Sequence, residues 1–186
     1  MKLLSLSIAV FCSSLFAAPT AYKVDTAASQ IKWVGKKVLG GGQHHGTINV
    51  KNGSVALEGD AVKSAEVVAD MTSITVVDLE KGSSKNADLT GHLNSDDFFS
   101  TAKHPTATFK VAGGKATMTI KGITKPVTIP LTVTKQGDAV SLTGKATLDR
   151  TQWNIHYRSN NFFKNLGDKA IADGFDIEVD LKATKG

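Results

Sequence analysis

The chain has 186 residues and a formal net charge of +5, from 22 basic and 17 acidic residues. Its lysines are spread evenly, with no basic stripe interleaved with aromatic residues, which excludes a nucleic-acid track and indicates solvated strand faces. Because Cys12 is the single cysteine, a disulfide scaffold is excluded too, and the length suits one domain with a core of its own.

Residues 1–17 predict a secretory signal peptide. Lys2 provides the positive start, an apolar run follows, and Ala17-Ala18-Pro19 offers a small-residue site that places cleavage after Ala17. The run is too short for a transmembrane helix, no later segment qualifies, and Phe11 before Cys12 disfavours a lipoprotein signal. We therefore expect one domain over residues 18–186 that is periplasmic or secreted.

Alternating apolar and polar residues predict short strands along the remaining chain, since strand side chains point alternately to two faces. The segments with this pattern are 31–34, 48–50, 55–57, 67–71, 107–111, 116–120, 127–133, 140–148 and 175–181. Asn52-Gly53 predicts a hairpin, because both central residues of such a turn need positive φ. Gly113-Gly114 and residues 136–138 predict two further turns.

Residues 40–46 read GGGQHHG and invite phosphate-binding interpretations, which they do not satisfy. Thr47 stands where a P-loop needs Lys, and a strand follows where a dinucleotide site needs a helix. A flexible or bulged connection is the better interpretation. His44 and His45 are adjacent on a predicted strand and point to opposite faces, so we expect no dedicated metal site and leave a minor metal role open.

Residues 89–109 interrupt the alternation and predict one helical turn laid over an apolar opening. Asn94-Ser95 suits an N-cap, Asp96-Asp97 suits the first turn, Phe98-Phe99 suits an apolar anchor, and His104-Pro105 ends the segment. We expect His92 to orient the preceding turn through a hydrogen bond to the backbone. The predicted cap and lid residues are His92, Asn94, Ser95, Asp96 and Phe98.

One apolar face per strand excludes a parallel sheet buried on both sides and leaves a sandwich or a barrel. We favour a closed, antiparallel up-and-down β-barrel of about eight strands, because closure removes exposed edges. Such a barrel is filled by its side chains or holds one small ligand. The residues alone leave these two alternatives equally open.

Catalytic chemistry finds little support. No serine lies in a Gly-x-Ser-x-Gly elbow, and Asp96-Asp97 fits a helix start better than an acid–base pair. Asp149-Arg150 and Asp173 fit turn or ion-pair roles. We therefore assign no catalytic residue, no metal and no cofactor other than a bound lipid.

Four motifs together resemble the YceI-like family of exported bacterial proteins. They are residues 69–74 (ADMTSI), 91–109 (GHLNSDDFFSTAKHPTATF), 118–127 (MTIKGITKPV) and 149–155 (DRTQWNI). The resemblance implies a lipocalin-like barrel with a helix near one end. It also implies a lumen that holds a long amphiphile: a polyisoprenoid, an isoprenoid quinone or a fatty-acid derivative.

We therefore expect a non-catalytic carrier or sequestering protein whose partner is an amphiphilic lipid. The predicted lumen residues are Trp33, Met71, Phe99, Phe109, Met118, Ile120, Ile129 and Phe175. Two alternatives remain: an enzyme acting on a lipid or quinone through His92 or Asp97, and a barrel scaffold for a protein partner. The sequence also leaves a homodimer open.

Overall fold

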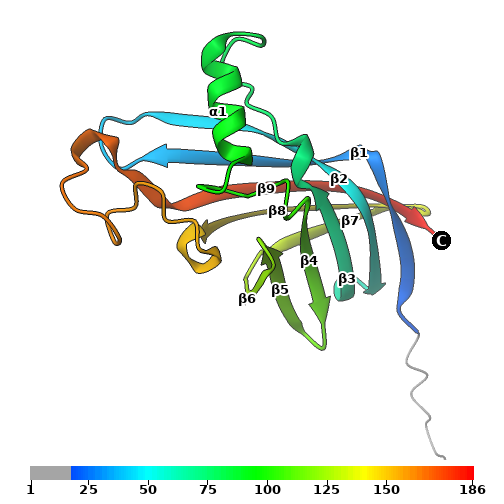
Figure 1. Ribbon diagram of the computed structural model, residues 1–186. Coiled ribbons are helices and arrows are strands. Elements are labelled where there is room, and N and C mark those ends of the chain that lie inside the picture. Colours follow the sequence, from blue (N-terminus) through cyan, green and yellow to red (C-terminus); the bar gives the residue numbers. More distant parts are fainter. Residues whose placement is uncertain (1–17) are drawn as a thin grey trace, which may run out of the picture.

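One antiparallel sheet of nine strands forms the body of the protein, in the order β6-β5-β4-β3-β2-β1-β9-β8-β7 (Figure 1). The computed structural model describes residues 18–186. Three short 3-10 helices and one α-helix complete the fold. The elements are β1 (Thr20–Lys37), β2 (Gln43–Glu58), β3 (Ala61–Asp70), η1 (Met71–Ser73), α1 (Ser84–Asn94), β4 (Thr106–Ala112), β5 (Lys115–Ile120), β6 (Ile123–Pro126), β7 (Leu131–Gln136), β8 (Ala139–Asp149), η2 (Arg150–Trp153), η3 (Gly167–Lys169) and β9 (Ile171–Lys185).

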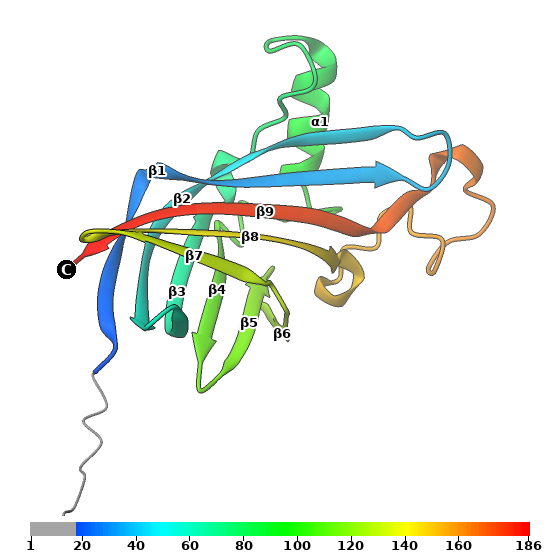
Figure 2. The same cartoon turned by 180° about the vertical axis from the view of Figure 1, so that it is seen from behind.

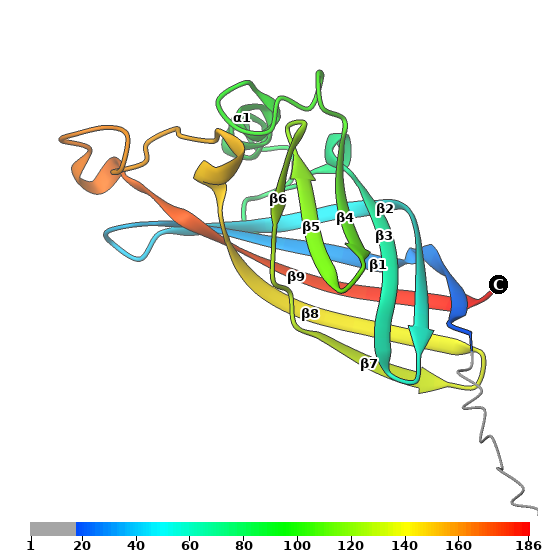
Figure 3. The ribbon, with the colours of Figure 1, turned by 90° about the horizontal axis from the view of Figure 1, so that it is seen from below.

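The sheet curls on itself into a half-barrel, as Figures 2 and 3 show from behind and from below. Its two ends are β6 and β7, which follow one another in the chain through the short connection 127–130. Within residues 18–186 no ladder pairs β6 with β7, and Pro126 and Pro130 have no N–H to donate to one. Lys135 of β7 instead donates to the carbonyl of Gly59 and pairs with Asp60 at 3.2 Å.

The alternating pattern places one face of each strand inside the curl. In β2, Ile48 and Val50 are buried while Asn49 and Lys51 are exposed. The buried residues form two apolar clusters, one around Trp33 and Trp153 and the other around Val55 and Leu142. The all-β, antiparallel prediction with one short helix is therefore confirmed, with nine strands rather than about eight. The expected closure is not seen: the barrel stays open between β6 and β7, because no ladder joins these two strands within residues 18–186.

The hairpin predicted at Asn52-Gly53 is wrong, because β2 runs through both residues. The turn from β2 to β3 lies at Gly59, whose φ is +57°, and a register shift follows Val50. Gly53 serves close packing instead, since an added Cβ would lie 2.9 Å from Cγ2 of Val24 and 3.2 Å from the carbonyl oxygen of Glu66. The predicted turns at 113–114 and 136–138 are confirmed.

The helix predicted after Asn94-Ser95 is also wrong in position, since α1 ends where that helix was expected to begin. The N-cap is Ser83, whose hydroxyl accepts from the N–H of Asn86 at 3.2 Å, and Ser95 is the C-cap. The sequence of α1 shows no apolar repeat of helical period, because the helix is polar along most of its length and buries only Leu93. Figure 1 shows α1 standing off the sheet.

The predicted signal peptide lies in residues 1–17, outside the described part of the chain. Among residues 18–186, no helix is both long enough and apolar enough to span a bilayer.

A candidate ligand cavity inside the curled sheet

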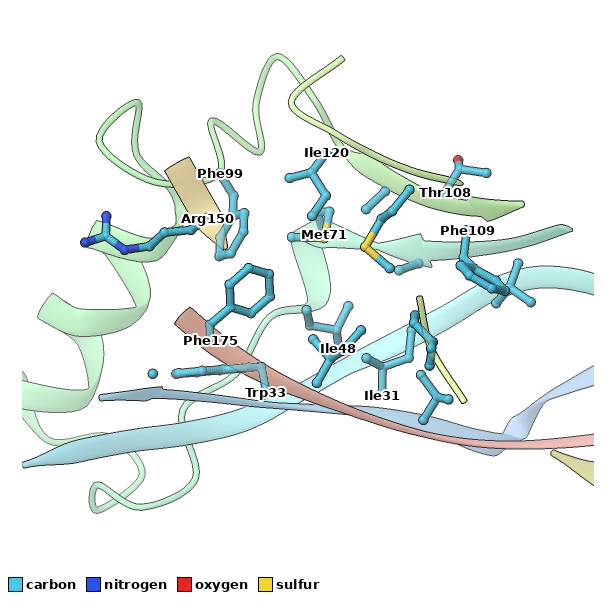
Figure 4. Close-up of a pocket in the computed structure, with 18 of the residues that line it drawn as sticks. Ile31, Trp33, Ile48, Met71, Phe99, Thr108, Phe109, Ile120, Arg150 and Phe175 are labelled. Atoms are coloured by element: carbon cyan, nitrogen blue, oxygen red, sulfur yellow. The ribbon is translucent and has the colours of Figure 1, made fainter. Parts of the chain in front are cut away.

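The concave side of the curled sheet lines a partly open cavity of about 150 Å³. Thr108 and Arg150 are the polar residues in its lining, and all the others are apolar or glycine. Figure 4 shows the apolar side chains converging on this space from several strands and from the segment after α1. A cavity with such walls offers few hydrogen bonds to water and favours apolar guests.

All eight predicted lumen residues line this cavity: Trp33, Met71, Phe99, Phe109, Met118, Ile120, Ile129 and Phe175. Seven of them were inferred from apolar alternation, which identifies the inward face of a strand irrespective of strand order. Phe99 was inferred from the predicted helix and lines the cavity from a turn instead. Their contact with a ligand stays a prediction.

The two ends of the cavity differ. At one end Phe99 and Phe175 face each other beside Trp33 and Arg150, and Phe109 lies toward the other end (Figure 4). The indole N–H of Trp33 donates to the carbonyl of Thr75 at 3.1 Å, so the ring is held by the segment that leads to α1. The aromatic end is therefore the one nearest the helix and the loops.

The turn after α1 positions Phe98 and Phe99. The amide of Phe98 donates to the carbonyl of Ser95 at 3.1 Å, and that of Phe99 to the carbonyl of Leu93 at 3.1 Å. Asn94 and Ser95 thus bond within the helix C-terminus: the Asn94 amide donates to the carbonyl of Thr90 at 2.9 Å and the Ser95 hydroxyl to that of His92 at 2.7 Å. Phe98 lines the cavity with Phe99, so the predicted cover is present without the predicted helix.

Asp96, Asp97 and His92 form surface contacts around this turn. Asp96 accepts from Lys103 Nζ at 2.7 Å and from the Ser100 hydroxyl at 2.8 Å, and these bonds hold the pKa of its carboxyl below the ordinary value. His92 bonds the Asp97 carboxylate at 3.0 Å, where we expected the backbone. Neither His92 nor Asp97 is among the residues that line the cavity.

His92 also joins the turn to the loop that follows η2. Its ring meets Phe98 edge-on with centroids 4.9 Å apart and meets Tyr157 edge-on at 4.5 Å. Such perpendicular contacts are favourable for aromatic pairs. His92 therefore packs behind the aromatic end of the cavity.

Arg150 is a site residue that we did not assign from the sequence. It is 4% exposed and donates to the carbonyls of Ile155, Ile171 and Ala172 at 2.7, 3.0 and 3.0 Å. Asp173 lies 3.3 Å from its guanidinium, as the predicted ion-pair role requires. Burial lowers the pKa of Arg150, and the nearby Asp173 opposes that shift.

A repeated Asp-x-Thr pattern identifies the position of Arg150. Asp149 accepts from the N–H of Thr151 at 2.9 Å and so starts η2, just as Asp70 accepts from the N–H of Thr72 at 3.0 Å and starts η1. In both motifs the middle residue, Arg150 or Met71, is 4% exposed and lines the cavity. The pattern at the end of a strand therefore points to an inward side chain.

His44 and His45 both contact the carboxylate of Asp78, His44 through its ring and His45 through its backbone. His44 Nδ1 lies 2.8 Å from Asp78 Oδ2, and the backbone N–H of His45 donates to Asp78 Oδ1 at 2.9 Å. Burial raises the pKa of Asp78, but these bonds outweigh it and lower the pKa overall. Within residues 18–186, no three His, Cys, Asp or Glu side chains are arranged so that they could hold a metal ion. The preceding Gly40-Gly41 turn has positive φ at both residues, as expected of a connection.

Taken together, a curled antiparallel sheet and an apolar cavity lined at one end by aromatic side chains define a lipocalin-like half-barrel. The model of the YceI-like domain family matches residues 22–183. The chain therefore belongs to the YceI-like family.

Two relatives show how far the likeness extends. Protein YceI of Escherichia coli strain UMN026 is 30% identical over 143 residues, which cover 69% of this chain and 71% of the relative. A UPF0312 protein of Azotobacter vinelandii is 30% identical over 95 residues, or 46% of each chain. The matched part of this chain thus spans about half the length of the second relative.

Two solved structures share the fold. BcnA of Burkholderia cenocepacia has a TM-score of 0.60 at 24% identity, covering 87% of this chain and 99% of that one. A polyisoprenoid binding domain from Saccharophagus degradans, implicated in plant cell wall breakdown, has a TM-score of 0.65 at 16% identity, covering 90% and 99%. At these identities the likeness concerns the fold.

Proposed function

We propose that this protein is an exported, non-catalytic binding protein that holds a long-chain amphiphile in its cavity. The ligand classes are a polyisoprenoid, an isoprenoid quinone and a fatty-acid derivative, and the role is transport, storage or sequestration. The observation that carries the proposal is the cavity inside the curled sheet with its almost wholly apolar lining. The polyisoprenoid binding domain of similar fold supports it.

The size of the cavity indicates which shape of ligand it can accommodate. The free space of about 150 Å³ is below the range of roughly 300–1,000 Å³ that is typical of small-molecule sites. Met71 and Met118 line the space, and unbranched thioether side chains change rotamer readily. A thin, flexible chain that displaces such side chains fits this cavity better than a wide, rigid ring system does.

Mass spectrometry of lipid extracted from the purified protein tests the proposal, followed by titration with a series of polyprenyl and fatty-acyl compounds. Affinity should rise by about 0.8 kcal/mol for each added methylene until the space is full. Ala107→Trp places a large side chain in the cavity and should lower the ligand chain length at which affinity stops rising. Ala112→Trp, on the exposed end of β4, is the matched control. A protein that purifies empty and ignores every compound of the series contradicts the proposal.

A second candidate is an enzyme that acts on a lipid or quinone, favoured by the 3.0 Å bond between His92 and Asp97. The position of both residues outside the cavity lining argues against it. His92→Ala should leave lipid affinity within about threefold and reduce stability through the lost aromatic contacts. Loss of a measurable turnover with fold and affinity intact would favour the enzyme instead. A scaffold role would require a stoichiometric protein partner and an empty cavity.

Export is part of the proposal and rests on the composition of residues 1–17. Expression of the full chain in a Gram-negative host, fractionation and N-terminal sequencing test it. We expect mature protein that starts at Ala18 in the periplasmic fraction. Uncleaved protein in the cytoplasmic fraction would contradict this part alone.

A further inference from the structure

Exposed apolar side chains gather on two loops at one end of the molecule. Val38 and Leu39 on the β1–β2 turn are 48% and 56% exposed, and Phe162 and Phe163 on the loop from η2 to β9 are 51% and 49% exposed. The N–H of Val38 donates to the carbonyl of Ala170 at 3.0 Å and joins the two loops. We call these four residues the apolar tip. Figures 1 and 2 show both loops at the end of the molecule away from the C-terminus.

The loop backbone fixes the outward position of the two phenylalanines. Ser159 is fully buried, and its carbonyl accepts from the amides of Phe162 and Phe163 at 3.1 and 2.9 Å. Its hydroxyl accepts from the N–H of Asn161 at 3.2 Å, and the Phe162 ring stacks on His156 with centroids 3.7 Å apart. Their exposure therefore belongs to a hydrogen-bonded loop, and an apolar patch presented in this way indicates a binding surface.

Cations surround the apolar tip. Lys37, Lys164 and Lys169 are exposed, and among residues 18–186 none of them has an ion-pair partner within 4.0 Å. Arg158 lies over the Tyr157 ring at 5.1 Å. Against these four cations, residues 154–170 contain a single acidic side chain, Asp168, and the turn 38–42 contains none. Asp173, which accepts from the Asn161 amide at 2.7 Å, is paired with Arg150. The tip thus combines apolar side chains with an excess of positive charge.

The loop of the apolar tip begins and ends at the cavity wall. Ile155 and Ile171 flank it and both line the cavity. Ile171 donates its N–H to the carbonyl of Arg158 at 2.9 Å and pairs in register with Lys37 of β1. A surface in contact with the tip would therefore lie close to one end of the cavity.

We propose that the apolar tip docks on an anionic lipid bilayer. The four apolar side chains enter the boundary between headgroups and acyl chains, and the surrounding cations contact anionic headgroups; an interfacial site with one apolar and one cationic component has this composition. Docking brings the aromatic end of the cavity against the lipid. The proposal needs no particular cavity ligand, so it can hold or fail independently of the proposed function.

Sedimentation with vesicles of phosphatidylcholine, with and without phosphatidylglycerol, tests the docking. The full chain and the form that starts at Ala18 are both measured, which separates binding through residues 1–17 from binding through the tip. We expect binding that needs phosphatidylglycerol and weakens with salt. The Phe162→Ser, Phe163→Ser double variant should lose roughly tenfold or more in affinity. Lys164→Gln and Lys169→Gln should each lose about fivefold.

Two matched controls accompany these variants. Val77→Ser removes an apolar side chain that is 54% exposed outside the tip, and Lys115→Gln removes an exposed cation at the β4–β5 turn. Both should bind vesicles like the unchanged protein. Circular dichroism checks the fold of each variant. Mass spectrometry of the lipid extracted from each variant shows whether the cavity is still occupied.

Equal binding by the tip variants and the unchanged protein would overturn the proposal, as would equal losses in the controls. Association of two copies that the phenylalanine substitutions abolish, without vesicle binding by the unchanged protein, would assign the tip to self-association and overturn it as well. Retained cavity lipid with lost vesicle binding supports docking as a separate property. An empty cavity with intact vesicle binding contradicts the proposed function alone.

Discussion

Gly46 shows how a single missing side chain allows the segment before α1 to approach β2. A Cβ at this position would lie 1.7 Å from the carbonyl oxygen of Thr75 and 2.8 Å from Trp33 Nε1. The same carbonyl accepts the hydrogen bond of the Trp33 indole at 3.1 Å. Glycine is thus required here for space, since its φ is not positive.

Gly46→Ala should lower the free energy of unfolding by about 2–4 kcal/mol, because backbone atoms must move to admit the methyl group. Gly91→Ala is the matched control: it lies inside α1 with no atom within 4 Å of the added Cβ, and should raise stability by about 0.5–1 kcal/mol. Urea denaturation of both variants measures the contrast. Two similar losses would contradict the assigned role of Gly46.

Arg150 fastens η2 to the start of β9 through its bonds to three carbonyls. Arg150→Met should cost about 3–5 kcal/mol of unfolding free energy, because the three carbonyls lose their donor and the Asp173 carboxylate loses its ion-pair partner. Arg158→Met, at the other arginine, loses a contact over Tyr157 and should cost about 1 kcal/mol or less. Equal midpoints of thermal unfolding for the two variants would count against the prediction.

At the scale of elements, α1 is the part of the fold that the sequence placed least well. Asn94-Ser95 followed by two acids has the composition of an N-terminus, but the same short polar side chains bond to carbonyls at a C-terminus. The true cap, Ser83, precedes a segment with almost no apolar period, so neither propensity nor pattern marks it. Tertiary bonds define it: the Asn86 amide donates to the carbonyls of Val76 and Leu79, both at 3.0 Å.

Ser83→Ala should reduce stability by about 1 kcal/mol through loss of the N-cap bond to Asn86. Ser84→Ala, one residue later on the exposed surface, should change stability by less than about 0.5 kcal/mol. Chemical denaturation followed by far-UV circular dichroism distinguishes the two. If Ser84→Ala proved the more harmful, the assigned cap would be wrong.

The strands were predicted better than the helix because alternation depends on the two faces of a strand and not on its neighbours. This period identified the lining residues Trp33 and Met118 without knowledge of the strand order. It failed at Gly53, where the approach of Val24 explains the glycine. The alternation gave no indication of Arg150, because the burial of this side chain depends on carbonyls up to 22 residues away in the chain.

At the scale of the whole molecule, the open seam between β6 and β7 divides the sheet into less and more protected parts. Each of these strands has one hydrogen-bonded neighbour, whereas β1 lies between β2 and β9. Amides of β6 and β7 should exchange with solvent faster than those of β1 and β9, because local opening there breaks fewer bonds. Hydrogen exchange with mass spectrometry measures the difference. Uniform protection across the nine strands would contradict the open seam.

Pro126 and Pro130 have a consequence for the protein in a crowded compartment. The free margins of a sheet are templates on which other chains polymerise, and proteins protect them with short strands, prolines and lysines. Here β6 is four residues long and ends in Pro126, while Pro130 precedes β7 and Lys125 and Lys135 stand on the two margins. These residues disfavour hydrogen-bonded pairing of β6 with β7. They also disfavour pairing of either edge with a strand of another molecule, so the open seam does not promote fibril formation.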